Sequence, residues 1–201
     1  LASPTLDFHL SDSYFVVGHF HYVMGGTVVF AMFAAIYFWW PKVTGRMLSE
    51  RLASWHFWLL MIGFNMTFFG MHLLGRNGMP RRVATYPSGL GWDGLNLVST
   101  LGSYLISAGV AVFIFNVLVS LRKAPDAGTN PWDADGLEWA SKTPLPPYNL
   151  RSIPMIGSRH PLWDDPDLPR RVQGGQGLLG TAPEALEFSI GEHGKPELAD
   201  R

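Results

Sequence analysis

The chain has 201 residues, of which 47% are hydrophobic and only 15% are charged, a low charged fraction for a soluble domain. Its formal net charge of −1 argues against a nucleic-acid partner. Because the sequence contains no cysteine, it excludes disulfides, thiolate zinc sites, iron–sulfur clusters and a cysteine-ligated copper centre within this chain.

Three apolar runs follow a short polar start, residues 1–12, which we expect to form a loop on the outer side of a membrane. Each run exceeds the length of about 18 residues that a membrane-spanning helix needs. The predicted spans cover residues 13–40, 52–74 and 95–121. Pro41 is expected to end the first span. Asn65, His72 and Asn116 are expected to face protein rather than lipid.

The remaining residues, 124–201, are rich in proline and glycine and show no sustained helical period. We expect an extended, mostly irregular tail that lies over neighbouring subunits without a core of its own. His160 and His193 in this tail are assigned no role. The predicted fold class is therefore an all-α membrane protein whose three-helix module, residues 13–123, is part of a larger helical bundle and carries the candidate site.

Two histidines separated by one phenylalanine, His19 and His21, lie within the first apolar run. Imidazole is costly in hydrocarbon, so the pair requires a strong partner. On a helix, residues two apart point about 200° from each other, so they cannot share one metal as an i, i+4 pair can. They could instead be ligands of two cofactors on opposite flanks, a geometry that suits adjacent haems. The alternative is a pair of hydrogen-bonded core histidines.

Basic residues predict the orientation of the helices. One group follows the first and third runs and opens the second, namely Lys42, Arg46, Arg51, Arg122 and Lys123. By the positive-inside rule these ends and the tail are cytoplasmic. Arg76, Arg81 and Arg82 on the opposite side violate the rule. They are explained either by pairing with buried anions or by snorkelling to lipid phosphates.

Three separate segments carry a resemblance to a known family. Residues 12–23, DSYFVVGHFHYV, resemble the tenth transmembrane helix of subunit I of haem–copper terminal oxidases. Residues 65–69, NMTFF, and 78–82, GMPRR, resemble the next helix and loop of that subunit, in the same order. The tail resembles that of actinobacterial cytochrome c oxidases, through NPW at 130–132 and LEW at 137–139. The chain is thus similar to the C-terminal portion of this subunit.

The resemblance implies a role for each matching residue. His19 would be the single axial ligand of the high-spin haem, where oxygen binds, and His21 one of two axial ligands of the low-spin haem. Arg81 and Arg82 would bind the haem propionates through charge-assisted hydrogen bonds. Anionic propionates would also explain why these arginines violate the positive-inside rule.

Further positions match the family less completely. Asp7 and Asp12 would lie near the same propionates. In the family a histidine often precedes the second of these acids, and the two help to hold a magnesium ion. Here that position is Ser11, which leaves Asp12 as the only candidate magnesium ligand. His56 and His72 match family positions and are expected to be hydrogen-bonded interior residues.

The implied cofactors are two haems, expected to be haem A, with a copper centre ligated outside this chain and a magnesium ion. The implied partners are the remainder of subunit I, a dicopper electron-entry subunit, other oxidase subunits, cytochrome c and the lipid bilayer. The assembled enzyme would reduce oxygen to water with electrons from cytochrome c and pump protons across a bacterial plasma membrane, whereas this chain alone would not be catalytic. The alternatives are a quinol oxidase of the same family, a bis-histidine dihaem electron-transfer anchor and a structural module without haem.

Overall fold

The computed structural model describes residues 1–147, 149–150, 152–175, 189–190 and 196–197. It divides into two compact units, Leu1–Gly128 and Thr129–Arg201, which are treated separately here. The first unit consists of α1 (Pro4–Leu10), α2 (Tyr14–Phe20), the π-helical segment η1 (His21–Val29), α3 (Phe30–Thr44), α4 (Glu50–Arg76) and α5 (Asp93–Leu121).

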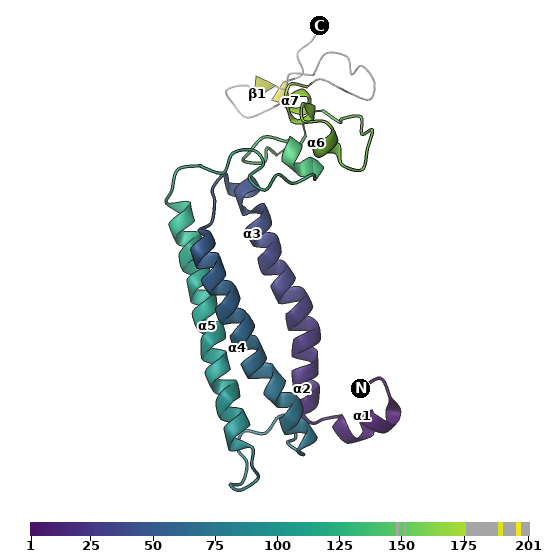
Figure 1. Ribbon diagram of the computed structural model, residues 1–201, viewed down its shortest axis with the longest axis vertical. Coiled ribbons are helices and arrows are strands. Elements are labelled where there is room, and N and C mark those ends of the chain that lie inside the picture. The colour runs from purple at the N-terminus through teal and green to yellow at the C-terminus, as the bar shows by residue number, and fades with distance from the viewer. Residues whose placement is uncertain (148, 151, 176–188, 191–195, 198–201) are drawn as a thin grey trace. The chain divides into compact units, whose positions relative to one another are not determined.

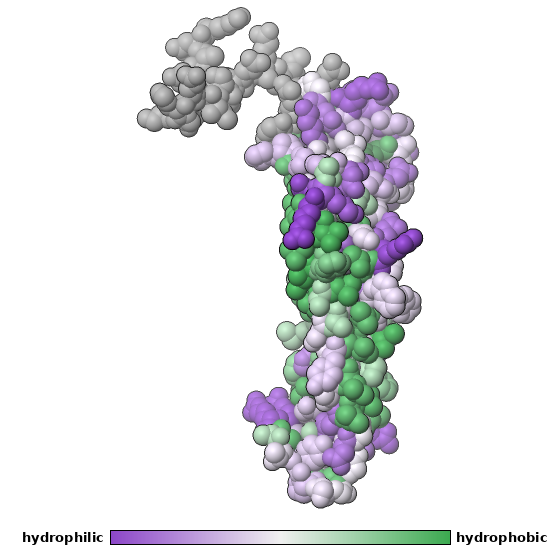
Figure 2. All heavy atoms as spheres, turned by 90° about the vertical axis from the view of Figure 1, so that its left-hand side faces the viewer, coloured by the Kyte–Doolittle hydropathy of each residue, from purple (hydrophilic) through white to green (hydrophobic). Residues whose placement is uncertain are grey.

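Three helices are long and apolar enough to cross a membrane: Tyr14–Thr44, Glu50–Arg76 and Asp93–Leu121. The first is continuous from α2 through η1 to α3 (Figure 1). On the face drawn in Figure 2, apolar residues form a band along the helices. The predicted all-α membrane fold with three spans is confirmed.

The first span starts where predicted but ends later, and the segment before it also differs from the prediction. Pro41 does not end it, because α3 continues to Thr44. A proline in the last turn removes only one helical hydrogen bond. Gly45 then closes the helix in the left-handed conformation, at φ 72°, with its N–H bonded to the Pro41 carbonyl oxygen at 2.8 Å. Before the span, residues expected to form a loop include the two-turn helix α1.

Helices α4 and α5 pack closely against each other. The Ser99 hydroxyl of α5 donates to the Thr67 carbonyl oxygen of α4 at 2.9 Å. At the other end of α5 the buried Asn116 amide accepts from the Ser49 N–H at 2.9 Å and donates to the Ser49 carbonyl oxygen at 3.1 Å. The end of α5 therefore lies beside the start of α4. Asn116 faces protein, as predicted.

The other two residues expected to face protein also contact neighbouring helices. The Tyr22 hydroxyl donates to the Asn65 side-chain oxygen at 2.7 Å. The His72 ring meets the Phe15 ring edge-on, with centroids 4.8 Å apart. Both contacts join the first span to α4, so the polar residues of these apolar helices mark helix–helix interfaces.

The second unit has a small core, contrary to the expectation of a coreless tail. It contains the 3₁₀ helix η2 (Leu137–Ala140), α6 (Pro161–Asp164), α7 (Leu168–Gln173) and two antiparallel two-residue strands, β1 (Ser189–Ile190) and β2 (Pro196–Glu197). Trp139, Leu168 and Val172 are almost completely buried where η2 and α7 pack together. The aromatic and aliphatic residues that form this core are widely spaced in sequence, so no local hydrophobic periodicity predicts it.

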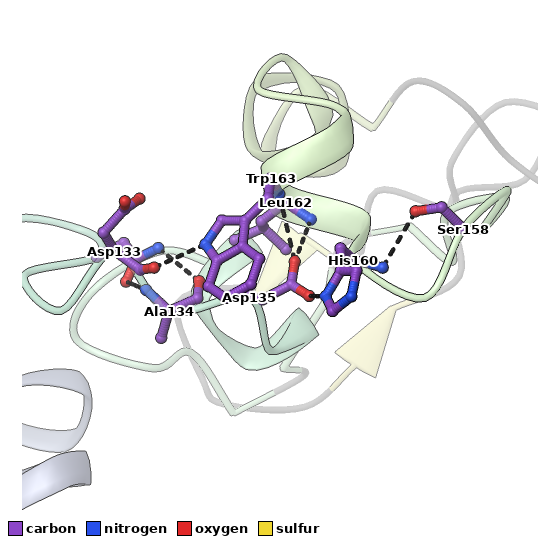
Figure 3. Close-up of polar contacts among 8 residues, drawn as sticks. Asp133, Ala134, Asp135, Ser158, His160, Leu162 and Trp163 are labelled. Carbon is purple, nitrogen blue, oxygen red and sulfur yellow. Dashed lines mark hydrogen bonds and ion pairs between the residues drawn. The ribbon is translucent and has the colours of Figure 1, made fainter.

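Asp135 organises the start of α6 (Figure 3). Its carboxylate accepts from the backbone N–H of Leu162 at 2.9 Å and of Trp163 at 3.2 Å, and from the His160 ring at 2.9 Å. Desolvation favours the protonated acid, but these hydrogen bonds and the His160 charge together lower the pKa of Asp135. His160, which had been given no role, thus tethers the 133–135 loop to α6, whereas His193 lies outside the described residues.

Candidate functional site

The helix that carries the histidine pair starts at a well-defined cap. The Ser13 side chain accepts from the Phe15 N–H at 3.2 Å and donates to the Leu10 carbonyl oxygen at 2.6 Å. The helix winds as an α-helix to Phe20 and as a wider π-helix from His21. The histidine pair therefore straddles a change of winding, a feature that is frequent at functional sites.

His21 is held in one orientation against α4. Its ring stacks on Phe68, with centroids 4.0 Å apart and planes 13° from parallel, and on Phe20 at 4.5 Å. Its Nδ1 lies 2.8 Å from the Val17 carbonyl oxygen. A carbonyl oxygen only accepts, so Nδ1 carries a proton, and the neutral ring presents a lone pair at Nε2. A hydrogen bond to one ring nitrogen is how metal-ligating histidines are commonly oriented.

His19 has different surroundings. It is exposed, and within the described residues its side chain makes no hydrogen bond or ring contact. Phe20, between the two histidines, is also exposed. Only His21 of the pair stacks against α4, so the two imidazoles do not share a neighbour. This arrangement is the one expected from a separation of two residues on a helix.

Two glycines allow the histidine-bearing helix to approach α4. A Cβ on Gly18 would lie 2.9 Å from the His72 ring and 3.0 Å from the Phe68 carbonyl oxygen. On the opposing helix, a Cβ on Gly75 would overlap the backbone of Phe15. The absence of side chains at both positions brings α2 directly onto α4, and this places Phe68 against the His21 ring.

The two other membrane histidines were expected to be interior residues with satisfied hydrogen bonds. His72 is partly buried; it contacts Phe15, and its Nδ1 lies 3.3 Å from the Phe69 carbonyl oxygen. His56 is buried, and its Nδ1 lies 3.2 Å from the Tyr37 hydroxyl. Its Nε2 has no hydrogen-bond partner in the described part of the chain, so His56 is only half satisfied.

The arginine loop is fixed to the start of the same helix. The Tyr14 N–H donates to the Met79 carbonyl oxygen at 2.8 Å, and the Arg81 N–H donates to the Asp12 carbonyl oxygen at 3.0 Å. Asp12 has a positive φ of 61°, which turns the chain there. The backbone thereby brings Arg81 beside the base of the helix whose second turn carries His19.

Four charged residues of this region differ in their pairing. The Arg81 guanidinium forms an ion pair with the Asp12 carboxylate, while its buried Nε has no partner among the described residues. Arg82 is exposed, with a φ of 67°, and makes no side-chain contact within the same residues. The structure therefore brings Asp12 and Arg81 together. It places Asp7 on α1, and no hydrogen bond or ion pair joins its side chain to either arginine.

The acidic residues do not form a metal site by themselves. Among the described residues no group of three histidine, cysteine or acidic side chains could hold a metal ion. The Asp12 carboxylate is already paired with Arg81. A hard cation such as magnesium takes about six oxygen ligands, so this chain supplies at most a small part of such a site.

Comparison with known proteins identifies the family. Residues 1–105 match the model of cytochrome c and quinol oxidase polypeptide I. The chain belongs to this family. It is 48% identical over 86% of its length to a putative cytochrome c oxidase subunit 1-beta of Streptomyces coelicolor, and 49% identical over 82% to a cytochrome c oxidase subunit 1 of Corynebacterium diphtheriae. A subunit 1 from Alkalihalophilus pseudofirmus is 46% identical over 81%.

The matches cover only part of these relatives. The alignments span 31%, 29% and 26% of the three proteins, respectively. The chain therefore spans less than a third of the length of the oxidase subunits it resembles. The predicted resemblance to the C-terminal portion of an actinobacterial-like oxidase subunit I is confirmed, and with its three apolar helices this makes the chain part of a membrane protein.

Proposed function

We propose that this chain is the C-terminal part of the catalytic subunit of a bacterial terminal oxidase, in which His19 and His21 each ligate one haem iron. The assembled enzyme reduces oxygen to water with electrons from cytochrome c and pumps protons across the plasma membrane, with the tail on the cytoplasmic side. The observation that carries the proposal is the His21 ring, because a bond to the Val17 carbonyl oxygen holds Nδ1 and leaves Nε2 for iron.

The residues present fit a pair of haems. His19 is exposed on an apolar helix and has no partner among the described residues. An unpaired imidazole at such a position is costly, and binding to a haem iron would remove that cost. Phe20 and Phe68 offer flat apolar faces beside His21, which suit contact with a porphyrin. His19 would hold the high-spin haem, and that haem would supply the site of oxygen binding and reduction.

The arginine loop supports the same proposal. The orphaned Arg81 Nε and the exposed Arg82 guanidinium provide hydrogen-bond donors for the haem propionates. Asp12 holds Arg81 in place through their ion pair. Asp7 on the neighbouring helix α1 belongs to the same outer region and is proposed to border the propionates. The backbone bonds from Tyr14 and Arg81 keep this loop in register with the histidine-bearing helix.

Magnesium is not supported in the same way. Asp12 is the one candidate ligand in this chain, and its carboxylate is engaged by Arg81. Any magnesium ion would depend on oxygen ligands from a neighbouring subunit. The copper centre, the second ligand of the low-spin haem and the electron-entry site are proposed to come from the remainder of subunit I and the dicopper subunit.

Visible absorption of the purified complex tests the histidine assignments. His21→Met should perturb the low-spin haem spectrum and leave the carbon monoxide difference spectrum intact, because His21 is not at the oxygen-binding haem. His19→Met should do the reverse. His9→Gln, a change at an exposed histidine of α1, is the control and should alter neither spectrum. If either ligand variant affected both haems equally, or neither, the assignments would fail.

The same spectra separate the competing functions. A reduced haem spectrum that shifts on addition of carbon monoxide supports an oxidase, whereas one insensitive to carbon monoxide points to a bis-histidine electron-transfer anchor. A complex without haem would be a structural module. Oxygen uptake with reduced cytochrome c or with a quinol as the donor distinguishes the two oxidase types, since the matched family includes both.

A further inference from the structure

Two adjoining cavities lie along the N-terminal part of α4, close to Arg51. The outer one, of about 480 Å³, is lined by Arg51, Ser54, Trp55 and Trp58. These residues are three and four apart, so they form one stripe on the helix. The inner cavity, of about 500 Å³, lies between α3 and α4. Ser54 and Trp58 line both cavities, so the two lie side by side along α4.

The outer cavity has the chemistry of a membrane interface. Trp55 and Trp58 are both more than half exposed, and indole rings favour the boundary between lipid tails and headgroups. The Arg51 guanidinium is exposed and makes no ion pair or hydrogen bond within the described residues. Glu50, the neighbouring acid, lines neither cavity. The free positive charge in this cavity therefore selects an anion, such as a phosphate.

The inner cavity is mainly apolar, although His56 and Ser54 also line it. It is lined mainly by aromatic and small residues, including Phe30, Phe33, Ala34, Tyr37 and Phe57. From Arg51 to Leu60 the two cavities follow ten residues of α4, which rise by about 14 Å. That length is close to half of the hydrocarbon core of about 30 Å, which is the depth of one leaflet. Each volume falls within the range of about 300–1,000 Å³ for ligand pockets.

We propose that the outer and inner cavities together bind one anionic phospholipid. Its phosphate lies on Arg51, its glycerol region between Trp55 and Trp58, and an acyl chain between α3 and α4. A protein helix is the less suitable occupant, because it would bury an unpaired guanidinium unless it carried a carboxylate at that level. A phospholipid supplies the anion and the apolar chain in one molecule, and basic sites between membrane helices bind such headgroups. The proposal does not depend on haem ligation.

Spin-labelled phosphatidylglycerol and phosphatidylcholine, added to the washed, delipidated complex, test the proposal by electron paramagnetic resonance. The wild-type complex should immobilise the anionic lipid preferentially. Arg51→Gln should weaken that preference about fivefold, the effect expected for one basic residue at a membrane surface. Arg122→Gln removes an exposed arginine just beyond α5 that lines neither cavity, and it should retain the preference.

A second pair of variants tests the apolar part. Ala34→Trp fills the inner cavity and should release both lipids from the immobilised population, whereas Met32→Trp, on the other side of α3, should not. Unchanged lipid selectivity in Arg51→Gln would overturn the proposal. It would also fail if no immobilised lipid responded to Ala34→Trp, since protein would then cover this face. The haem spectra should be the same in all four variants, so this test is separate from that of the haem ligands.

Discussion

The close contact between α4 and α5 at Gly63 predicts that an added methyl group there destabilises the helix pair. A Cβ at this position would lie 2.8 Å from both the Gly102 carbonyl oxygen and the Ile106 nitrogen. These are backbone atoms and cannot rotate away, so Gly63→Ala requires the two helices to separate by roughly half an ångström, and overpacking of this kind costs about 1–3 kcal/mol. Alanine recovers about 0.5–1 kcal/mol through helix propensity, which leaves a net loss centred on about 1 kcal/mol.

Gly70 on the same helix is the matched control. A Cβ there would lie 3.7 Å from Leu95 Cδ2 and 3.8 Å from Ser99 Oγ, which are ordinary contacts. Gly70→Ala should therefore be neutral or slightly stabilising, and the two variants should differ by about 2 kcal/mol. Thermal unfolding of the purified complex, followed by loss of the monodisperse species, measures this difference. Equal stability of the two alanine variants would refute the packing argument.

Three further predictions concern other contacts. Asn116→Ala leaves the Ser49 N–H without its partner and removes one of the two hydrogen bonds to the Ser49 carbonyl oxygen, which still accepts from the Ala53 N–H, so it should cost about 1–3 kcal/mol in thermal unfolding of the complex. Thr100→Ala, exposed on the same helix, should cost under about 0.5 kcal/mol. Asp135→Asn should reduce amide-exchange protection at Leu162 and Trp163 at neutral pH. Because the folded pKa of Asp135 is lowered, the wild-type protection should be full above the ordinary carboxyl pKa and fall as pH drops through the lowered value. Arg81→Ala should shift the haem midpoint potentials in a redox titration while haem is retained, and complete haem loss would contradict a role at the propionates.

The sequence was sufficient to predict the three spans and the divergence of the histidine pair. Hydropathy over about 20 residues and the angle between positions two apart depend little on tertiary context. The helix continues past Pro41 and ends at the Gly45 cap, four residues later, so the proline alone did not predict its end. The stacking of His21 on Phe68 likewise required the close approach at Gly18, which spacing alone does not reveal.

The core of the second unit could not be predicted for a different reason. Trp139 is buried by α7, which lies about thirty residues further along the chain, and the intervening segment is rich in proline. The His160 contact depends in the same way on Asp135, twenty-five residues earlier. Local composition indicated irregular structure correctly, but it carries no information on which distant aromatic and charged residues meet.

The arginines at and after the end of α4 had two explanations from sequence, and the geometry of Arg81 favours pairing with an anion for that residue. A snorkelling arginine extends its charged group to lipid phosphates and water. Arg81 instead has a buried Nε and is turned toward Asp12 at the base of the histidine-bearing helix. A buried guanidinium nitrogen without a partner is costly unless an acceptor reaches it. His19, near the same end of this helix, has no partner for its ring nitrogens among the residues that the structure describes. A haem has both an iron for the imidazole and carboxylates for the guanidinium, so one ligand of this class would satisfy both groups, whereas a lipid phosphate would reach only the guanidinium.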